Sequence, residues 1–320
     1  MAFRRSFLRP LAAREPIRRP ELFLVASALT ETNVTLLAAL RRLGFAAEFL
    51  PPDLIDRRLA PGDTVLSRLD VRATLDGVEA GAWELRRAQR SGVVVLNETA
   101  ALLRSHDKLA TALALAHAGV PHPRTAQVGK PGNEPPVGVP AVVKPRFGSW
   151  GRDVFACRSP EEYVACLTRV RSRAWFRAQG ALVQELVPPC GYDLRVLVAG
   201  GRVVGAVERH AAPGEWRTNV ALGARRRPAA PGQRAARLAV DAARAVGGDL
   251  VGIDLLPLAG DDYTVLEVNG AVEFTSAYGL AGADVFEEVA RAVAAALAAS
   301  TGAAGAPALR LTEKATSRGG

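Results

Sequence analysis

Lysine, methionine, cysteine and histidine are all scarce in this chain of 320 residues. It contains four Lys, one Met, three Cys and four His, whereas Arg occurs 37 times. Cys157, Cys166 and Cys190 form no C-x-x-C pair and no even framework, and no histidine spacing matches a zinc site. The sequence therefore argues against a disulfide scaffold and a zinc domain. It indicates a reducing compartment, for which we expect the cytoplasm.

Long hydrophobic runs are also missing. A membrane-spanning helix needs roughly 18 uncharged apolar residues, whereas the Ala/Val-rich segment after Asp284 is interrupted by Glu287, Glu288 and Arg291. The composition, 49% hydrophobic and 23% charged, is ordinary for a globular protein, and the length favours roughly two domains. We therefore expect no membrane span and no membrane partner.

Basic charge gathers at the two ends of the chain. The formal net charge is +9 and the pI is about 10.1, a balance that would by itself suggest nucleic-acid binding. Residues 1–20 carry +5 and residues 297–320 carry +2, so the remainder is nearly neutral. Because residues 1–20 lack an apolar signal core and residues 298–320 are rich in small residues, we expect a disordered basic arm and a disordered tail. We expect no nucleic-acid partner.

Residues 21–97 alternate between strand and helix patterns. Short apolar runs predict strands, and a 3.6-residue period of apolar positions predicts helices. The expected strands are 22–26, 45–50, 64–69 and 93–96, and the expected helices are 33–43 and 81–90. Short connections between alternating strands and helices indicate a small parallel α/β domain.

Residues 98–297 have a different pattern, with antiparallel hairpins. We expect Ser105 or His106 to cap a helix that runs to His117, and Ser159 to start another through a capping box with Glu162. Glycine turns at 200–201 and 260–262 predict two hairpins. The other expected elements are strands at 141–146, 153–158, 181–187, 194–199, 202–209, 251–256 and 264–268, and helices at 235–246 and 283–298.

Three side chains that carry oxygen atoms lie in the last predicted hairpin. Asp254 interrupts an otherwise apolar strand, where an unpaired carboxylate would cost several kcal/mol. Glu267 and Asn269 are two residues apart on the next strand and share a face. Such an oxygen-only set suits Mg²⁺ or Mn²⁺. The alternative is a buried network of Arg and carboxylate groups.

Two of the three lysines in the body of the chain occupy notable positions. Lys144 ends a predicted strand just before the glycine-punctuated loop 147–152, and Lys108 begins a predicted helix. Backbone N–H groups of a Gly-rich loop can fold over phosphate oxygens. A solvated helix residue and an ordinary hairpin turn are the alternatives for Lys108 and for the loop.

The order of short motifs resembles the ATP-grasp ligases of the RimK/LysX type, a family of alpha-L-glutamate ligases and amino-group-carrier ligases. The resemblance covers roughly residues 20–297. It implies an ATP-grasp fold, with two α+β subdomains that grip ATP at residues 98–297 and a lid subdomain at about 121–187, preceded by the small parallel α/β domain at 21–97. The matching segments are Ser105-His106-Asp107-Lys108, Val143-Lys144-Pro145, Gly148-Ser149-Trp150-Gly151-Arg152, Val183-Gln184-Glu185-Leu186-Val187, Asp193-Leu194-Arg195, Glu208-Arg209, Arg217-Thr218-Asn219, Gly252-Ile253-Asp254 and Glu267-Val268-Asn269.

The resemblance also implies roles for individual residues. Lysines 108 and 144 would hold the ATP phosphates, residues 184–187 would line the adenine, and the acid at 193 would lie near the ribose. The implied nucleotide-binding set is Lys108, Lys144, Gly148, Ser149, Trp150, Gly151, Gln184, Glu185, Leu186, Val187 and Asp193. The groups implied to act on the γ-phosphate and an acyl phosphate are Arg195, Arg209 and Asn219, and the implied ligands of two Mg²⁺ (or Mn²⁺) ions are Asp254, Glu267 and Asn269.

The activity implied by this resemblance is ATP-dependent formation of an amide between a carboxylate and an amine. Residues 148–152 and 267–274 look more like the LysX branch, in which the carboxylate donor is a glutamate of a small acidic carrier protein or peptide and the acceptor is an amino acid or amine. Gly270-Ala271 departs from that branch, so RimK-like addition of glutamate to a peptide or small molecule stays open. The Arg225–Arg227 run fits either an acidic acceptor or a solvated face. A non-catalytic nucleotide-binding regulator and a homo-oligomer also stay open.

Overall fold

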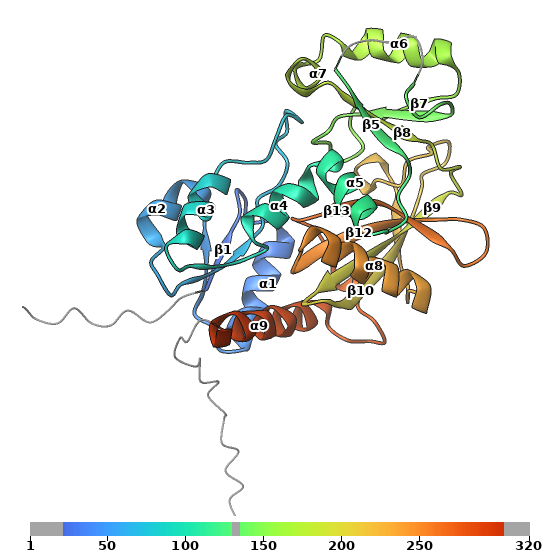
Figure 1. Cartoon of the computed structure of the whole chain (residues 1–320). Coiled ribbons are helices and arrows are strands. Elements are labelled where there is room, and N and C mark those ends of the chain that lie inside the picture. Colours follow the sequence, from blue (N-terminus) through green and yellow to red (C-terminus); the bar gives the residue numbers. More distant parts are fainter. Residues whose placement is uncertain (1–21, 130–134, 304–320) are drawn as a thin grey trace, which may run out of the picture.

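Three β-sheets organise the part of the chain that the computed structural model describes, residues 22–129 and 135–303 (Figure 1). The N-terminal sheet has the strand order β2-β1-β3-β4, the lid sheet β5-β8-β6-β7, and the central sheet β11-β10-β9-β12-β13. The expected arm at 1–20 lies outside the described residues, as does the tail from residue 304 onwards.

The N-terminal sheet is parallel throughout, as the sequence predicted. Every residue of β1 and β3 is buried, because helices cover a parallel sheet and leave its central strands no solvent-facing side. Thr30 caps the first helix by accepting a hydrogen bond from the N–H of Asn33. The elements are β1 (Leu22–Val25), α1 (Glu31–Arg42), β2 (Ala47–Leu50), α2 (Ile55–Arg58), β3 (Thr64–Ser67), α3 (Ala82–Arg90) and β4 (Val94–Leu96).

The connection to the rest of the chain differs from the sequence prediction at one helix start. Ser105 and His106 do not cap a helix; they end α4 (Thr99–His106), which the sequence analysis did not include. The cap of α5 (Lys108–His117) is Asp107, whose Oδ1 accepts from the N–H groups of Leu109 and Ala110 at 3.1 and 3.3 Å. The prediction was wrong because Asp is an equally good N-cap and α4 is only two turns long.

The lid sheet is antiparallel and carries its helices on one face. Its strands are β5 (Thr125–Val128), β6 (Ala141–Lys144), β7 (Phe155–Cys157) and β8 (Ala181–Glu185), and the helices are α6 (Pro160–Val170) and α7 (Ala174–Gln179). The capping bond of α6 runs from the Glu162 N–H to Ser159 Oγ at 3.3 Å, as expected. Strand β5 was missed because its residues are half exposed and lack an apolar run. The lid helices lie on the side away from the central sheet (Figure 1).

The central sheet is antiparallel and has one apolar face and one mixed face. Helix α8 (Gln233–Val246) covers the apolar face, where Val196, Val198 and Ile253 are buried. The elements are β9 (Tyr192–Ala199), β10 (Arg202–His210), β11 (Arg225–Pro228), β12 (Leu250–Pro257) and β13 (Tyr263–Asn269). Both expected hairpins, β9–β10 and β12–β13, are present. Strand β11 was not predicted, because three arginines and a proline show no apolar alternation.

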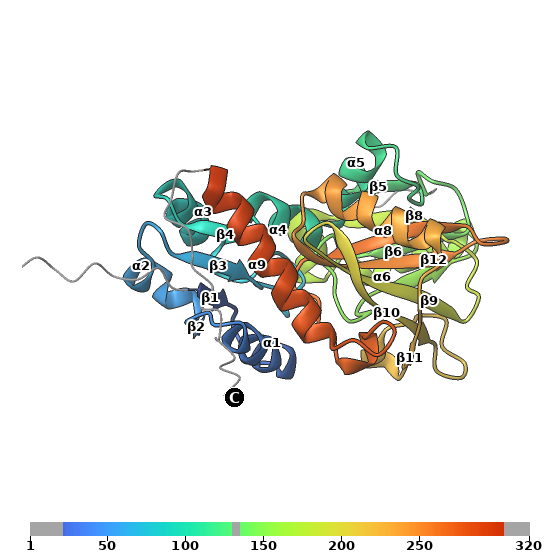
Figure 2. The ribbon, with the colours of Figure 1, turned by 90° about the horizontal axis from the view of Figure 1, so that it is seen from below.

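The last helix joins the N-terminal domain to the central sheet. Helix α9 (Val285–Ala303) crosses between the two sheets and packs along α1 (Figure 2). It continues beyond residue 298, where a disordered tail was expected to begin. Nearby, the buried Asn97 side chain accepts from the Leu250 N–H at 2.8 Å and donates to the Leu250 carbonyl at 2.9 Å, so the two domains share a hydrogen-bonded seam. No helix in the described ranges is long and apolar enough to cross a membrane.

Candidate active site

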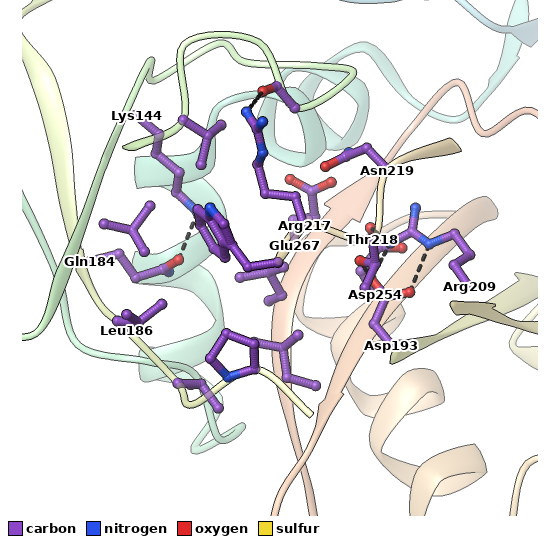
Figure 3. Close-up of a pocket in the computed structure, with 18 of the residues that line it drawn as sticks. Lys144, Gln184, Leu186, Asp193, Arg209, Arg217, Thr218, Asn219, Asp254 and Glu267 are labelled. Atoms are coloured by element: carbon purple, nitrogen blue, oxygen red, sulfur yellow. Dashed lines mark hydrogen bonds and ion pairs between the residues drawn. The ribbon is translucent and has the colours of Figure 1, made fainter. Parts of the chain in front are cut away.

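A cavity lies between the lid sheet and the central sheet (Figure 3). The empty space between its walls, open solvent included, is about 980 Å³. It brings together segments from α5, β6, β8, β9, β10, β12 and β13. We call it the nucleotide cavity. Every site residue that the sequence analysis predicted lines it except Arg195 and Asn269, which line a neighbouring cavity.

Lys144 ends the buried strand β6 and points into the nucleotide cavity (Figure 3). Its Nζ donates to Gln184 Oε1 at 2.6 Å, on the adjacent strand β8. Burial, together with the nearby charge of Lys108, lowers the pKa of Lys144 to about 8. The Gln184 amide group in turn donates to Thr125 Oγ1 at 2.9 Å. The expected place of Gln184 beside the adenine stays a prediction; its side chain accepts a hydrogen bond from Lys144.

Lys108 meets Glu267 at the floor of the cavity. The Lys108 Nζ lies 2.9 Å from Glu267 Oε2 and donates to the Gly148 carbonyl of the lid at 2.7 Å. Burial alone would raise the pKa of Glu267, but the ammonium groups of Lys108 and Lys144 hold it far below its usual range. Glu267 is therefore a carboxylate at every physiological pH.

A buried network of arginines and carboxylates crosses the central sheet beside these groups. Asp254 accepts two hydrogen bonds from Arg195, both at 2.6 Å, and one from Arg209 at 2.8 Å. Arg209 also makes a two-point contact with Asp193. Burial alone would lower the pKa of Arg209, but the two carboxylates raise it well above its ordinary value. Both guanidinium groups are thus permanently charged and fixed in orientation.

Asp193 lines the nucleotide cavity, but its carboxylate is bonded to protein groups. Its carboxylate is fully buried and accepts from Arg209 and, at 2.6 Å, from Thr218 Oγ1. Its expected contact with the ribose stays a prediction. The Glu185 carboxylate, expected at the adenine, also lines the cavity and pairs with Arg124 at 3.1 Å on the surface. Both acids therefore have ion-pair partners within the protein.

The lid loop, residues 147–152, closes over the cavity through two contacts with the segment after β10. Arg217 Nη1 donates to the Gly151 carbonyl at 2.9 Å. Arg217 is itself oriented by Glu215, whose pKa falls to about 2 because Arg217 donates hydrogen bonds to its carboxylate. Gly151 has φ +70°, and a Cβ there would lie 2.7 Å from Asn219 Oδ1. Only glycine fits this approach without strain.

A second cavity adjoins the first and has an empty volume of about 660 Å³. The two cavities share five lining residues: Ser149, Trp150, Arg209, Asn219 and Glu267. Asp70 reaches the second cavity from the end of β3, and Glu273 and Arg226 reach it from the segment after β13 and from β11. Sequence reasoning did not assign Asp70 or Glu273, and it left Arg226 open between an acidic acceptor and a solvated face, because only the tertiary structure brings β3, β11 and β13 to one space.

Gly270 explains part of the departure from the LysX-like pattern. A Cβ at this position would lie 2.4 Å from Ser105 Oγ and 3.1 Å from Leu102, both on α4. The close approach of α4 therefore excludes any larger residue. Ala271, the next residue, lines the second cavity and leaves room there.

The expected metal ligands fit a divalent cation only in part. Strand register places Asp254 directly opposite Glu267, and Asn269 opposite Gly252. Glu267 and Asn269 face the second cavity, and the Asn269 amide nitrogen is buried with no partner among the described residues. Because this NH2 group is a donor, it suits an anionic or carbonyl oxygen and is not itself evidence for a cation. Both oxygens of Asp254 already accept hydrogen bonds from guanidinium groups. This is the buried network of Arg and carboxylate groups that the sequence analysis gave as the alternative to a metal site.

Within residues 22–129 and 135–303, no cluster of three or more His, Cys, Asp or Glu side chains is placed to hold a metal. A hard cation that takes its remaining oxygens from phosphates suits such a sparse set.

A lid sheet and a central sheet that hold lysines around one cavity, after a parallel N-terminal sheet, define an ATP-grasp enzyme. A family model described as the RimK-like ATP-grasp domain matches residues 105–293. A probable alpha-L-glutamate ligase of Teredinibacter turnerae is 30% identical over 231 residues, which cover 69% of this chain and 74% of that protein. The chain belongs to the RimK-like ATP-grasp family, and it is an ATP-dependent ligase.

Solved structures share the fold. The RimK domain ATP-grasp protein of Sphaerobacter thermophilus superposes with a TM-score of 0.61 at 22% identity, covering 85% of this chain and 98% of that one. The ATP-grasp ligase PsnB, in complex with a phosphomimetic variant of its minimal precursor, Mg and ADP, gives a TM-score of 0.60 at 20% identity, covering 86% and 98%. These similarities confirm the ATP-grasp fold class that the motif order predicted.

Proposed function

We propose that the chain joins a carboxylate to an amine in two steps. The carboxylate first takes the γ-phosphoryl group of ATP, which yields an acyl phosphate and ADP; the amine then attacks the acyl carbon and expels phosphate. The observation that carries the proposal is that two cavities meet at Glu267, Arg209 and Asn219. A phosphoryl group held in the first can be passed there to a carboxylate held in the second.

Lys108 and Lys144 would hold the ATP phosphates. They are the only lysines in the described residues, and both line the nucleotide cavity. Compact ammonium groups can contact a phosphate oxygen where a planar guanidinium has no room. On this proposal the phosphates replace Glu267 and Gln184 as partners of the two lysines, so ATP binding frees Glu267.

Arg195, Arg209 and Asn219 would act on the transferring group. Arg195 and Arg209 are held rigidly by Asp254, so their donors need no reorganisation when negative charge develops on the phosphoryl and acyl oxygens. Asn219 lies at the boundary of the two cavities beside the lid loop. Phosphoryl transfer needs such positioning and charge neutralisation rather than a side-chain nucleophile.

Glu267 and Asn269, with Asp254 at the edge of the set, would hold magnesium. Two Mg²⁺ ions (or Mn²⁺) bound there would neutralise charge on the phosphate oxygens. This chain would supply Glu267 as an ionised ligand once Lys108 turns to the phosphates. The lid loop would exclude water, because Arg217 and Lys108 both bond its carbonyl groups.

The carboxylate donor would be a glutamate of a small acidic peptide or carrier protein, and the acceptor an amino acid or amine. Support comes from the relatives named probable alpha-L-glutamate ligases and from a PsnB complex with its precursor peptide. RimK-like addition of glutamate to a peptide end or small molecule is the second candidate, favoured by Ala271, whose small side chain leaves room in the second cavity. Consumption of ATP and the free cysteines at 157, 166 and 190 agree with a cytoplasmic enzyme.

Trapping with hydroxylamine tests this proposal. The full chain would be incubated with Mg²⁺, ATP and a panel of glutamate-ended acidic peptides, and hydroxamate and ADP would be measured. We expect an ATP-dependent hydroxamate, because hydroxylamine intercepts an acyl phosphate. If ATP and Mg²⁺ bind but no peptide yields hydroxamate or ADP above the background without peptide, the protein is a nucleotide-binding regulator instead.

A further inference from the structure

A chain of hydrogen bonds joins the central sheet to Lys144 through one histidine. His122 is half buried and lies in the connection between α5 and β5. Its Nδ1 lies 2.7 Å from the Val265 carbonyl on β13, and the Val265 N–H donates to the Pro121 carbonyl at 2.9 Å. These two contacts with Val265 fix the histidine to β13, the edge strand of the central sheet.

The Val265 carbonyl determines which ring nitrogen of His122 carries the proton. A carbonyl oxygen can only accept a hydrogen bond, so Nδ1 must be the nitrogen with the proton. Burial, together with the nearby charge of Lys144, lowers the pKa of His122 to about 4, so the ring has a single proton at neutral pH. The other nitrogen, Nε2, is therefore an acceptor.

This acceptor faces the side-chain amide of Gln184 on β8. The amide nitrogen of Gln184 lies 3.2 Å from His122 Nε2 and 2.9 Å from Thr125 Oγ1, so its two N–H groups have two acceptors. Thr125 accepts there with a lone pair, because its hydroxyl donates to the Pro123 carbonyl at 2.9 Å. The amide oxygen is thereby turned to the other side, where it accepts from Lys144 Nζ at 2.6 Å.

The reversed amide would fail at both ends in the free protein. Its nitrogen would face the ammonium group of Lys144, which has donors only, and its oxygen would face the lone pair of His122. Both contacts would be repulsive. Gln184 and Lys144 both line the nucleotide cavity (Figure 3), so Gln184 presents an acceptor to this cavity and not a donor.

His122 matters most once a nucleotide is bound. On the proposed function the phosphates take Lys144 away from Gln184, so the ammonium group no longer holds the amide. His122 and Thr125 still hold it, because neither residue lines the nucleotide cavity. The Gln184 oxygen is then an acceptor without a donor. A purine with an amino group at C6 can donate to it, whereas a keto group at C6 would meet it with a lone pair.

We propose that His122 is a positioning residue for base selectivity: its Nε2 holds Gln184 with the amide oxygen toward the base, which favours a 6-amino purine nucleotide over a 6-keto one. The proposal rests on the ligase function and on the expected place of Gln184 beside the adenine. It adds to that site a residue that lies outside the cavity and acts only through Gln184.

Equilibrium binding of nucleoside diphosphates tests the proposal without any turnover. The full chain with Mg²⁺ would be titrated calorimetrically with ADP and with IDP, which carries a keto group at C6. The measured quantity is the ratio of the two dissociation constants. We expect ADP to bind at least about tenfold more tightly in the parent protein. Any preference that comes from other contacts with the base stays the same in the variants, so the change in this ratio reports the role of His122.

Two variants remove the acceptor at position 122. In His122→Leu the Gln184 amide can turn over and offer its nitrogen to a keto group, so the preference for ADP should fall about three- to tenfold. His122→Asn should have the same effect, although its shorter side chain can still donate to the Val265 carbonyl; loss of that anchor therefore cannot explain the result. His117→Leu is the matched control, because His117 is an exposed histidine of α5, and it should keep the parent preference.

A double variant shows whether the histidine acts through the amide. Gln184→Leu should lower the preference for ADP by itself, and the addition of His122→Leu should change it no further. Circular dichroism and thermal unfolding check that each variant is folded.

Three results would overturn the proposal alone: the parent binds IDP as tightly as ADP, the His122 variants keep the parent ratio, or His122→Leu lowers the ratio further in the Gln184→Leu background. If neither nucleotide binds, the proposal fails together with the ligase function. If ADP binds but the hydroxamate assay gives no product, the ligase function fails and the ratios still decide the role of His122.

Discussion

Lys108 Nζ lies 2.9 Å from Glu267 Oε2, so a residue implied to bind phosphate and a residue implied to bind metal neutralise each other. The same ammonium group donates to the Gly148 carbonyl in the lid loop. One lysine therefore connects the lid, the floor of the nucleotide cavity and the expected metal site. On the proposed function, binding of Mg²⁺ and ATP would exchange these contacts together and would couple nucleotide binding to the position of the lid.

Replacement of Lys144 by arginine should weaken ATP binding nearly as much as replacement by alanine. Its Nζ sits 2.6 Å from Gln184 at the end of a fully buried strand, and a guanidinium is too large for this place. The affinity for an ATP analogue measures the effect. Lys130→Arg is the control; Lys130 lies outside the described residues, in a stretch of sequence rich in Pro and Gly, and should tolerate the change. Equal affinity of Lys144→Arg and the parent protein would contradict the argument.

ATP affinity should fall as the pH rises above about 8. The pKa of Lys144 is lowered to about 8 in the free protein, so its ammonium is fully present below that pH and is lost above it. Bound phosphate raises this pKa again, so binding takes up a proton at alkaline pH, and the dissociation constant should rise by up to about tenfold per pH unit. Titrations between about pH 7 and pH 9.5 measure the slope. Lys144→Ala should have a flatter profile over the same range.

Asp254 and Glu267 should respond differently to substitution, although both variants should lose ATP turnover. Asp254→Ala leaves Arg195 and Arg209 without their shared carboxylate in the buried network, which should cost about 3–5 kcal/mol of unfolding free energy. Glu267→Gln keeps the shape of the side chain but removes the negative charge that offsets Lys108 and the buried Lys144, so its free energy of unfolding should also fall, by less than in Asp254→Ala because Lys108 is partly exposed. Urea denaturation and ADP release measure the two effects. Near-normal ADP release at saturating Mg²⁺ in either variant would exclude that residue as a metal ligand.

Gly151→Ala should lower kcat/KM for ATP, whereas its loss of unfolding free energy should be no larger than that of an ordinary Gly→Ala change at a positive φ. An added Cβ would lie 2.7 Å from Asn219 Oδ1 and 2.8 Å from Leu222, so the lid loop would have to move away from the cavity. Gly201→Ala is the matched control: this glycine has φ +76°, close to the +70° of Gly151, but nothing lies within 4 Å of its added Cβ. Both variants should lose about 1–2 kcal/mol from backbone strain, and only Gly151→Ala should lower kcat/KM for ATP. A similar loss of kcat/KM in both would show that strain, not the lid contact, is responsible.

Local patterns along the chain determined a large part of this protein. Apolar runs that alternate with helical periods predicted the parallel N-terminal sheet, and glycine turns predicted the β9–β10 and β12–β13 hairpins. The order of short motifs pointed to the family, because each motif consists of consecutive residues and can be recognised without knowing which residues lie near it in space. The scarcity of lysine singled out Lys108 and Lys144, which share one cavity.

Contacts between distant segments could be decided only by the tertiary structure. Asp254 pairs with Arg195 and Arg209 because β9, β10 and β12 lie in one sheet. The order of strands in a sheet cannot be read from the sequence of any single strand. Whether Arg225, Arg226 or Arg227 faces the second cavity depends on the register of β11 with β10, and a shift of one residue would reverse it. Asp70 lines that cavity only because the segment after β3 lies beside the central sheet.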